Sequence, residues 1–251
     1  MEKYFDINNN GHSIRCKLYC NDPRNYKKII VCGHGFAGHK DNKATSAFAE
    51  VVLSKKKDVA ILAFDWPAHG QDVKKKLLLE DCNTYLGLVI EYCNKELGVT
   101  DIKGYANSFG AFVYLDYIAK YGNPFTKVAL RSPAITIYDS LMNNIMTKEN
   151  LEAINKGRAA QVGFDRKTTI TQEYIDELKA SDVRKNEYID EFEKILILHG
   201  DEDEIIDFNA VKQFADDNLI EFVTIEGGDH RFMRPAAMGT ARKHVIEFLD
   251  L

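Results

Sequence analysis

The sequence predicts an α/β fold in which helices cover both faces of a mainly parallel central sheet. Short, continuously apolar runs bounded by turn residues alternate along the chain with stretches whose apolar residues recur at helical spacing. Strands that are apolar on both faces are typical of parallel sheets buried between helices. The 251 residues suffice for one large core, and no repeat, low-complexity tract or linker divides them. We therefore expect a single domain spanning residues 1–251.

The chain begins with a predicted β-hairpin. Alternating apolar and polar residues at 4–7 and 14–19 indicate two strands, and Asn-Asn-Gly at 9–11 joins them. Asn-Gly between two such runs is a strong signal for a tight antiparallel turn. This hairpin should form one edge of the sheet.

The later elements alternate between strand and helix. Buried strands are expected at 29–32, 59–64, 101–106, 128–130, 195–198 and 220–225. Helices are expected around 44–52, 86–97, 109–121, 208–217 and 236–249, with Gly98 as the C-cap of the second. A repeated β-α-β order with apolar strands predicts parallel strand pairs that are connected by crossover helices.

Residues 134–190 interrupt this alternation. The segment is rich in charged residues, and its pattern indicates two short helices, with Thr147 and Thr171 as N-caps, and no clear strand. It is far longer than an ordinary connection, which has about 4–6 residues. We interpret it as a helical cap, or lid, inserted into the α/β core. The alternative is a pair of surface helices that have no role at a site.

The stretch from Ile102 to Gly110 predicts a strand that turns sharply into a helix at Ser108. Small residues, Ala106 and Gly110, stand two positions before and after this serine. A nucleophile elbow requires such residues, because the neighbouring chain packs closely around a strained serine. At the helix start, unpaired N–H groups and the helix dipole favour a developing anion. The alternative is that Ser108 merely caps the helix that begins near Phe109.

Three further motifs follow predicted strands. They are His34-Gly-Phe-Ala-Gly38, His199-Gly-Asp-Glu-Asp203 and Gly227-Gly-Asp-His230. Ligands bind outside the carboxyl ends of the strands in open α/β sheets, so these motifs should meet at one edge. Together with Ser108 they place a serine, an aspartate and a histidine in that order along the chain.

The four motifs resemble those of the α/β-hydrolase superfamily, and the resemblance covers nearly the whole chain. Within that superfamily, His34-Gly-Phe-Ala-Gly38, Ser132-Pro-Ala134 and the short cap are most similar to bacterial cinnamoyl/feruloyl esterases and related small carboxylesterases. The chain departs from the usual elbow at three positions. Ala106 replaces a glycine, Asn107 stands where histidine is common, and Ala111 stands where a further glycine is frequent. All three keep the elbow compact.

The resemblance implies an acyl-enzyme mechanism carried by the matching positions. Ser108 would be the nucleophile, His230 the base and acid, and Asp203 the carboxylate that orients the imidazole. The backbone N–H groups of Phe36 and Phe109 would form the oxyanion hole. The chemistry of these groups agrees, since a serine hydroxyl needs a base and a buried carboxylate fixes the tautomer of that base.

Other residues near the strand ends compete for these roles. Three histidines are alternative bases to which we assign structural roles: His34 as a brace of the oxyanion loop, His69 as a brace of its own turn, and His199 as a structural hydrogen-bonding group. Three carboxylates compete with Asp203: Asp201, Asp207 and Asp229. We favour Asp203 because it lies five positions into the loop that follows its strand.

An apolar stripe at the start of the cap has helical spacing: Tyr138, Leu141, Met142 and Ile145. Such a face must be buried, either on the core or over the mouth of a site. We expect Leu141 and Met142 to bind substrate, because methionines adapt to varied ligands. The alternative is that the stripe only packs against the core.

Composition excludes several classes of function. The net charge is −5 and the basic residues are scattered, which argues against a nucleic-acid partner. No apolar stretch approaches the ~18 residues of a membrane helix, and residues 1–25 hold no apolar core of a signal peptide. The five cysteines form no C-x-x-C pair, which is typical of reduced thiols, so we expect a cytoplasmic protein. Neither metal-ligand spacing nor a phosphate-binding or dinucleotide-binding glycine motif is present, so we expect no metal and no cofactor.

The sequence therefore predicts a serine hydrolase of small-to-medium carboxylic esters, with aryl and hydroxycinnamoyl esters among them. The expected partner is this small-molecule substrate, and the oligomeric state is left open. An acyl thioesterase, a serine peptidase of the same fold and a non-catalytic small-molecule-binding protein are the alternatives.

Overall fold

The structure, a computed structural model, describes residues 1–9, 11–73, 75–163 and 166–251. Within these residues an eight-stranded sheet has the strand order β1-β2-β4-β3-β5-β6-β9-β10. The strands are β1 (Glu2–Asn9), β2 (His12–Cys20), β3 (Lys28–Gly33), β4 (Val59–Phe64), β5 (Asp101–Asn107), β6 (Lys127–Arg131), β9 (Ile195–Gly200) and β10 (Glu221–Ile225). Strand β2 is antiparallel to both its neighbours, and all other pairs are parallel. The predicted α/β fold and its antiparallel edge hairpin are thus confirmed; Asn10 of the predicted turn lies outside the described residues.

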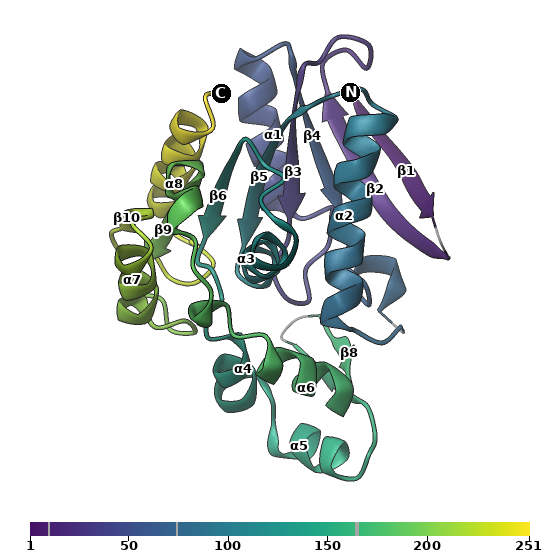
Figure 1. Cartoon of the computed structure of the whole chain (residues 1–251), viewed down its shortest axis with the longest axis vertical. Coiled ribbons are helices and arrows are strands. Elements are labelled where there is room, and N and C mark those ends of the chain that lie inside the picture. Colours follow the sequence, from purple (N-terminus) through teal and green to yellow (C-terminus); the bar gives the residue numbers. More distant parts are fainter. Residues whose placement is uncertain (10, 74, 164–165) are drawn as a thin grey trace.

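Helices cover both faces of the sheet (Figure 1). Apolar residues of α2 (Leu79–Lys95), α3 (Phe109–Tyr121) and α7 (Phe208–Asp217) belong to the buried cluster on one face. Residues of α1 (Lys43–Lys55) and α8 (Pro235–Phe248) belong to the cluster on the other. A short 3-10 helix, η1 (Gly70–Asp72), precedes α2. Helix α2 ends at its C-cap Glu96, so Gly98 is not the cap but takes a positive φ of 68° two residues later.

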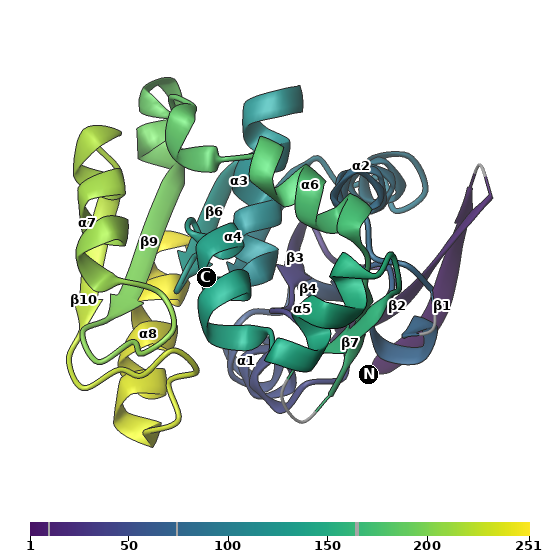
Figure 2. The ribbon, with the colours of Figure 1, turned by 90° about the horizontal axis from the view of Figure 1, so that it is seen from below.

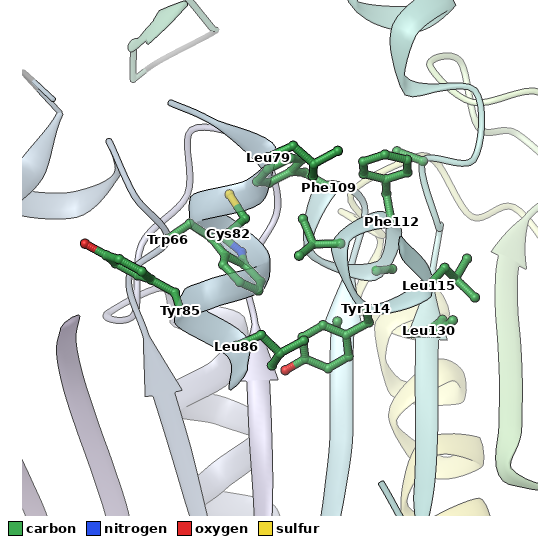
Figure 3. Close-up of a cluster of buried hydrophobic side chains, with 14 of the residues drawn as sticks. Trp66, Leu79, Cys82, Tyr85, Leu86, Phe109, Phe112, Tyr114, Leu115 and Leu130 are labelled. Atoms are coloured by element: carbon green, nitrogen blue, oxygen red, sulfur yellow. The ribbon is translucent and has the colours of Figure 1, made fainter. Parts of the chain in front are cut away.

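The core is built mainly on the face that α2 and α3 cover. Trp66, Phe109, Phe112 and Tyr114 are almost completely buried there. Figure 3 shows side chains of α2 and α3 that point into this cluster, with Trp66 between them and the sheet. Helix α3 is therefore held rigidly, and Ser108 directly precedes it.

The segment 134–190 lies beyond the carboxyl ends of the central strands (Figures 1 and 2). It contains α4 (Ile137–Ser140), the π-helical turn η2 (Leu141–Ile145), α5 (Lys148–Asn155), α6 (Gln172–Ala180) and the 3-10 turn η3 (Val183–Lys185). A further 3-10 turn, η4 (Ile189–Lys194), begins at its end and leads into β9. It also holds a two-stranded antiparallel pair, β7 (Ala160–Val162) and β8 (Thr168–Ile170), although the sequence indicated no strand. These strands have three residues each, which is too short for an alternating pattern to show.

Candidate active site

Ser108 lies at the sharp turn between β5 and α3. Its backbone has φ 51° and ψ −118°, a conformation that costs a non-glycine residue about 1–3 kcal/mol. Close packing holds this turn: a Cβ on Gly110 would lie 2.7 Å from the carbonyl oxygens of Gly33 and His34. Gly33 pairs with Ala106 in the neighbouring strand. Because Gly33 has no side chain, there is room for the methyl group of Ala106, which stands where the usual elbow has a glycine.

Three side chains that are distant in sequence form a hydrogen-bonded chain at this turn. The Oγ of Ser108 lies 2.9 Å from Nε2 of His230, and Nδ1 of His230 lies 2.8 Å from Oδ2 of Asp203. Ser108 follows β5, Asp203 follows β9 and His230 follows β10, so the sheet brings their loops to one edge. The Ser108 side chain makes no capping bond to α3, and its hydroxyl is bonded to His230 instead.

Asp203 is held as a carboxylate although its side chain is fully buried. Its Oδ1 accepts hydrogen bonds from the N–H groups of Ile205 and Ile206, at 2.9 Å each, and Nε2 of His199 lies 3.2 Å from its Oδ2. Burial by itself raises the pKa of Asp203, but the hydrogen bonds from His199 and His230 outweigh it and hold that pKa well below its usual value. The ionised form can therefore stabilise a positively charged imidazole.

The competing carboxylates have other partners. Asp201 accepts from the N–H of Gly227, and Asp229 accepts from backbone N–H groups of its own loop. Asp207 caps helix α7 through the N–H of Ala210. Among the described residues, Asp203 is thus the carboxylate that hydrogen-bonds to the His230 ring.

Phe36 and Phe109 line the same cavity as Ser108. Phe109 is the first residue of α3, where N–H groups have no partner within the helix. No acceptor for either N–H group is found in the part of the chain that the structure describes. The loop that carries Phe36 is fixed by its next residue, because the N–H of Ala37 donates to Nε2 of His69 at 3.0 Å. Both amides are available to an oxyanion.

His34 and His69 support this loop and do not reach Ser108. The Nδ1 of His34 donates to the carbonyl of Gly35 at 2.8 Å, and its Nε2 accepts from the N–H of Trp66 at 3.3 Å. His69 donates from Nδ1 to a carbonyl of its own turn and lies flat against the Phe109 ring. Burial lowers the pKa of each imidazole to about 3, so both are neutral near pH 7.

A cavity of about 110 Å³ opens at Ser108. Its wall on the side of segment 134–190 is mainly apolar and includes Ile137, Leu141 and Ile145, with Ser140 and Tyr174 as its polar members. Met142, which we expected beside Leu141, is not among the described residues that line the cavity; it is half-buried against the core. Leu141 and Met142 are consecutive residues of the π-helical turn at 141–145, so their side chains point in different directions.

Comparison with known families identifies the fold. Residues 16–151, more than half of the chain, match the family described as alpha/beta hydrolase of unknown function (DUF900). The chain belongs to this α/β-hydrolase family. The match includes the Ser108 elbow and confirms the resemblance that the motifs predicted, while no curated protein sequence matches the hydrolase significantly.

Solved structures agree with this assignment. Est1E from Butyrivibrio proteoclasticus with ferulic acid bound has a TM-score of 0.77 at 21% identity, and the alignment covers 98% of this hydrolase and 100% of that chain. The esterase domain of a Rhodothermus marinus protein has a TM-score of 0.71 at 16% identity, with 100% and 98% covered. A soluble variant of the Saccharomyces cerevisiae monoglyceride lipase, in complex with a substrate analogue, has a TM-score of 0.72 at 16% identity. That alignment covers 99% of this hydrolase and 94% of the lipase chain. At these identities the similarity shows the fold.

The part of the hydrolase that the structure describes contains no group of three or more metal-binding side chains. All five cysteines belong to that part and are buried thiols without a disulfide. No helix within the described ranges is long and apolar enough to cross a membrane.

The buried neutral histidines predict a stability that depends on pH. The imidazoles of His34 and His69 have a pKa of about 3 in the folded hydrolase, against about 6.5 in the unfolded chain. The unfolded state therefore binds more protons between these values, and stability is complete above about pH 6.5 and is lost as the pH falls. Each group contributes a slope of about 1.4 kcal/mol per pH unit well below pH 6.5. Thermal melting from pH 7 to 4 should show this slope, and His69→Gln should reduce it; equal slopes would contradict the assignment.

Asp203→Asn should lower kcat by about 10⁴-fold with a far smaller effect on substrate binding, because an amide cannot stabilise the imidazolium that forms on His230. Asp201→Asn is the matched control, since this exposed carboxylate bonds to the N–H of Gly227 and not to His230. Steady-state kinetics of both variants would test the assignment. If Asp201→Asn lowered kcat more than Asp203→Asn does, the carboxylate that assists His230 would be Asp201.

Leu141→Ala should shift substrate preference toward bulkier acyl groups, because the shortened side chain leaves space that a larger substrate can fill. The expected change in relative kcat/KM is about fourfold per methylene accommodated, which corresponds to roughly 0.8 kcal/mol. Met142→Ala is the control on the neighbouring residue, which does not line the described cavity. A series of esters of increasing acyl length would measure this. If both variants lower all rates by one factor, Leu141 is only a packing residue.

Proposed function

We propose that this protein is a serine hydrolase that cleaves carboxylic esters through an acyl-enzyme intermediate. The observation that carries the proposal is the continuous hydrogen-bonded chain from Ser108 through His230 to Asp203, at distances of 2.9 and 2.8 Å. Ser108 and His230 line a cavity together with Phe36 and Phe109, whose N–H groups have no acceptor among the described residues. A structural cluster would not require a strained serine at the end of this chain.

In the first step, Nε2 of His230 takes the proton of the Ser108 hydroxyl while Oγ attacks the ester carbonyl carbon. The carbonyl oxygen becomes an oxyanion and accepts hydrogen bonds from the N–H groups of Phe36 and Phe109. In other enzymes, removal of one such oxyanion-hole donor reduces the stabilisation of the transition state by about 2.7–4 kcal/mol. His230 then gives its proton to the leaving alkoxide as the C–O bond breaks, and the acyl group stays on Ser108.

In the second step, His230 takes a proton from a water molecule, whose oxygen attacks the acyl carbon. The second tetrahedral oxyanion collapses, the carboxylic acid leaves, and the proton returns from His230 to Ser108. Asp203 stabilises the imidazolium in both steps without accepting its proton.

The apolar wall supports an acyl or aryl group as the part of the substrate that enters the cavity. We place residues 134–190 over that group as a cap, with Leu141 at the substrate and Met142 behind it. Est1E binds ferulic acid in a structure of the same fold, which makes aryl and hydroxycinnamoyl esters the first compounds to test.

An active-site-directed fluorophosphonate tests the proposal directly, because it labels a serine only when that serine is activated. Wild-type protein should be labelled and Ser108→Ala should not. A panel of matched ester, thioester and amide substrates then separates an esterase from a thioesterase or a peptidase. Absence of both labelling and turnover would refute the hydrolase and favour a non-catalytic binding protein.

A further inference from the structure

A second cavity, of about 380 Å³, adjoins the one at Ser108. The two share lining residues, including Phe36, Asn107 and Arg131. The second cavity is lined by three arginines, Arg131, Arg166 and Arg231, and its described lining residues include no carboxylate. This is unexpected in a chain with 38 acidic and 33 basic residues. We call this cavity the arginine groove.

Arg131 is the central residue of the arginine groove. Its side chain is buried, with 6% exposed, and in the described residues it forms no ion pair. One Nη donates to the carbonyl of Arg231 at 3.0 Å, the guanidinium lies 5.0 Å from the ring centre of Phe232, and Nε has no hydrogen-bond partner. Burying a charged group without a counterion is energetically unfavourable. An anion in the groove would remove much of this cost.

The position of Arg131 relative to the nucleophile is fixed by the backbone. Arg131 ends β6 and pairs with Asn107 of β5, and its carbonyl accepts the N–H of Ser108 at 2.9 Å. The guanidinium therefore belongs to the residue whose main chain positions the catalytic serine. A ligand that pairs with the Arg131 guanidinium would therefore bind close to Ser108.

The rim of the groove adds two features that favour an anion. Arg166, in the loop between β7 and β8, is exposed and forms no ion pair with the described residues. The N-terminal end of the thirteen-residue helix α1 also borders the groove, through Asn42 and Ala44. Helix N-termini favour negative charge through unpaired N–H groups and the helix dipole.

We propose that the arginine groove is an anion subsite of the substrate-binding site. The substrate would be an ester with an apolar group in the cavity at Ser108 and a carboxylate or phosphate that pairs with Arg131, with Arg166 at the rim. This proposal rests on the proposed ester hydrolysis and names a class of substrate for it. A planar guanidinium suits either anion because it donates two parallel hydrogen bonds.

Matched substrate pairs test the subsite. Mono-(4-nitrophenyl) glutarate against its methyl ester places a carboxylate on the acyl side. The butyrate ester of 4-hydroxybenzoate, compared with that of 4-hydroxybenzamide, places the carboxylate on the alcohol side of the ester. In 4-(butyryloxy)phenyl phosphate, a phosphate takes the place of that carboxylate. At low ionic strength the charged member of at least one pair should have a kcat/KM at least ten times higher, the size expected for one hydrogen bond to a charged group. The pair that shows the preference identifies the side and the anion.

Variants assign any preference to the groove. Arg131→Gln should bring the charged-to-neutral ratio close to one, and Arg166→Gln should lower it severalfold. Arg24→Gln is the matched control, because it removes the same charge from a side chain that is 91% exposed. Arg24 lies in the loop before β3, at the amino end of that strand, whereas the arginine groove lies at the carboxyl ends. The ratio within one preparation does not depend on the folded fraction, and the exposed Arg166 gives an answer even where the Arg131 variant unfolds. The subsite is overturned if the charged-to-neutral ratio of kcat/KM is one or less in every pair. It is also overturned if neither arginine variant changes that ratio.

A binding measurement separates this proposal from the proposed function. Calorimetry of Ser108→Ala with 4-hydroxybenzoate, monomethyl glutarate and phenyl phosphate needs no turnover. At least one anion should bind, and adding Arg131→Gln should weaken it at least tenfold, whereas 4-hydroxybenzamide should be unaffected. If an anion binds but no ester is cleaved, the subsite stands and the hydrolase fails. If neutral esters are cleaved and no anion binds, the hydrolase stands and the subsite fails.

Discussion

Ser108→Ala should lower kcat for ester hydrolysis by about a millionfold, because a triad acts as a unit and loses nearly all its catalysis with its nucleophile. The fold should survive. Alanine keeps the Cβ at the strained φ, and the serine side chain makes no capping bond to α3 that would be lost. Hydrolysis and thermal melting should therefore be measured on the same preparation.

The two measurements distinguish the roles that Ser108 could have. A large loss of activity at an unchanged melting temperature assigns it as the nucleophile. Activity near that of the wild type would refute this assignment. A large fall in melting temperature would instead indicate that the hydroxyl stabilises the turn.

His230→Ala should lower kcat to a similar extent, roughly 10⁵–10⁶-fold, because the imidazole moves a proton in both halves of the reaction. The small cavity left beside Ser108 should admit free imidazole, which should restore part of the activity in proportion to its concentration. His244→Ala, on the outer helix α8, is the control and should retain full activity. A variant as active as the control would show that another group acts as the base.

Much of the fold could be predicted because its signals are local. Val59–Phe64 and Phe208–Asp217 have the bounds that the pattern predicts, since a continuously apolar strand and an amphipathic helix each leave a clear periodicity. The loops with Asp203 and His230 could also be predicted, because parallel strands place their carboxyl ends at one edge. These signals need no knowledge of tertiary contacts.

The remaining features depend on packing that the sequence does not display. The spacing of Tyr138, Leu141, Met142 and Ile145 suggested one helical face, but only Leu141 and Ile145 of these four are among the described residues that line the cavity. His199 was expected to be a structural hydrogen-bonding group, but its contact with Asp203 could not be predicted, because only the loop after β9 brings the two side chains together. In the sequence, Arg131 is only a basic residue at the end of a short apolar strand, so its role in an anion subsite could not be predicted. The proposal depends on its burial, which only the structure shows.

The segment 134–190 leaves the sheet after β6 and returns to β9, and these two strands are neighbours in register, with Val128 opposite Ile195. Its two ends are therefore anchored side by side by backbone hydrogen bonds that do not involve the segment itself. A segment of different length or shape could be exchanged between these anchors without breaking the strand pairs that precede the loops of Ser108, Asp203 and His230. In the hydrolase that we propose, specificity could thus diversify while the central sheet stays the same, and a chimera that carries a different segment should be joined at the same two junctions.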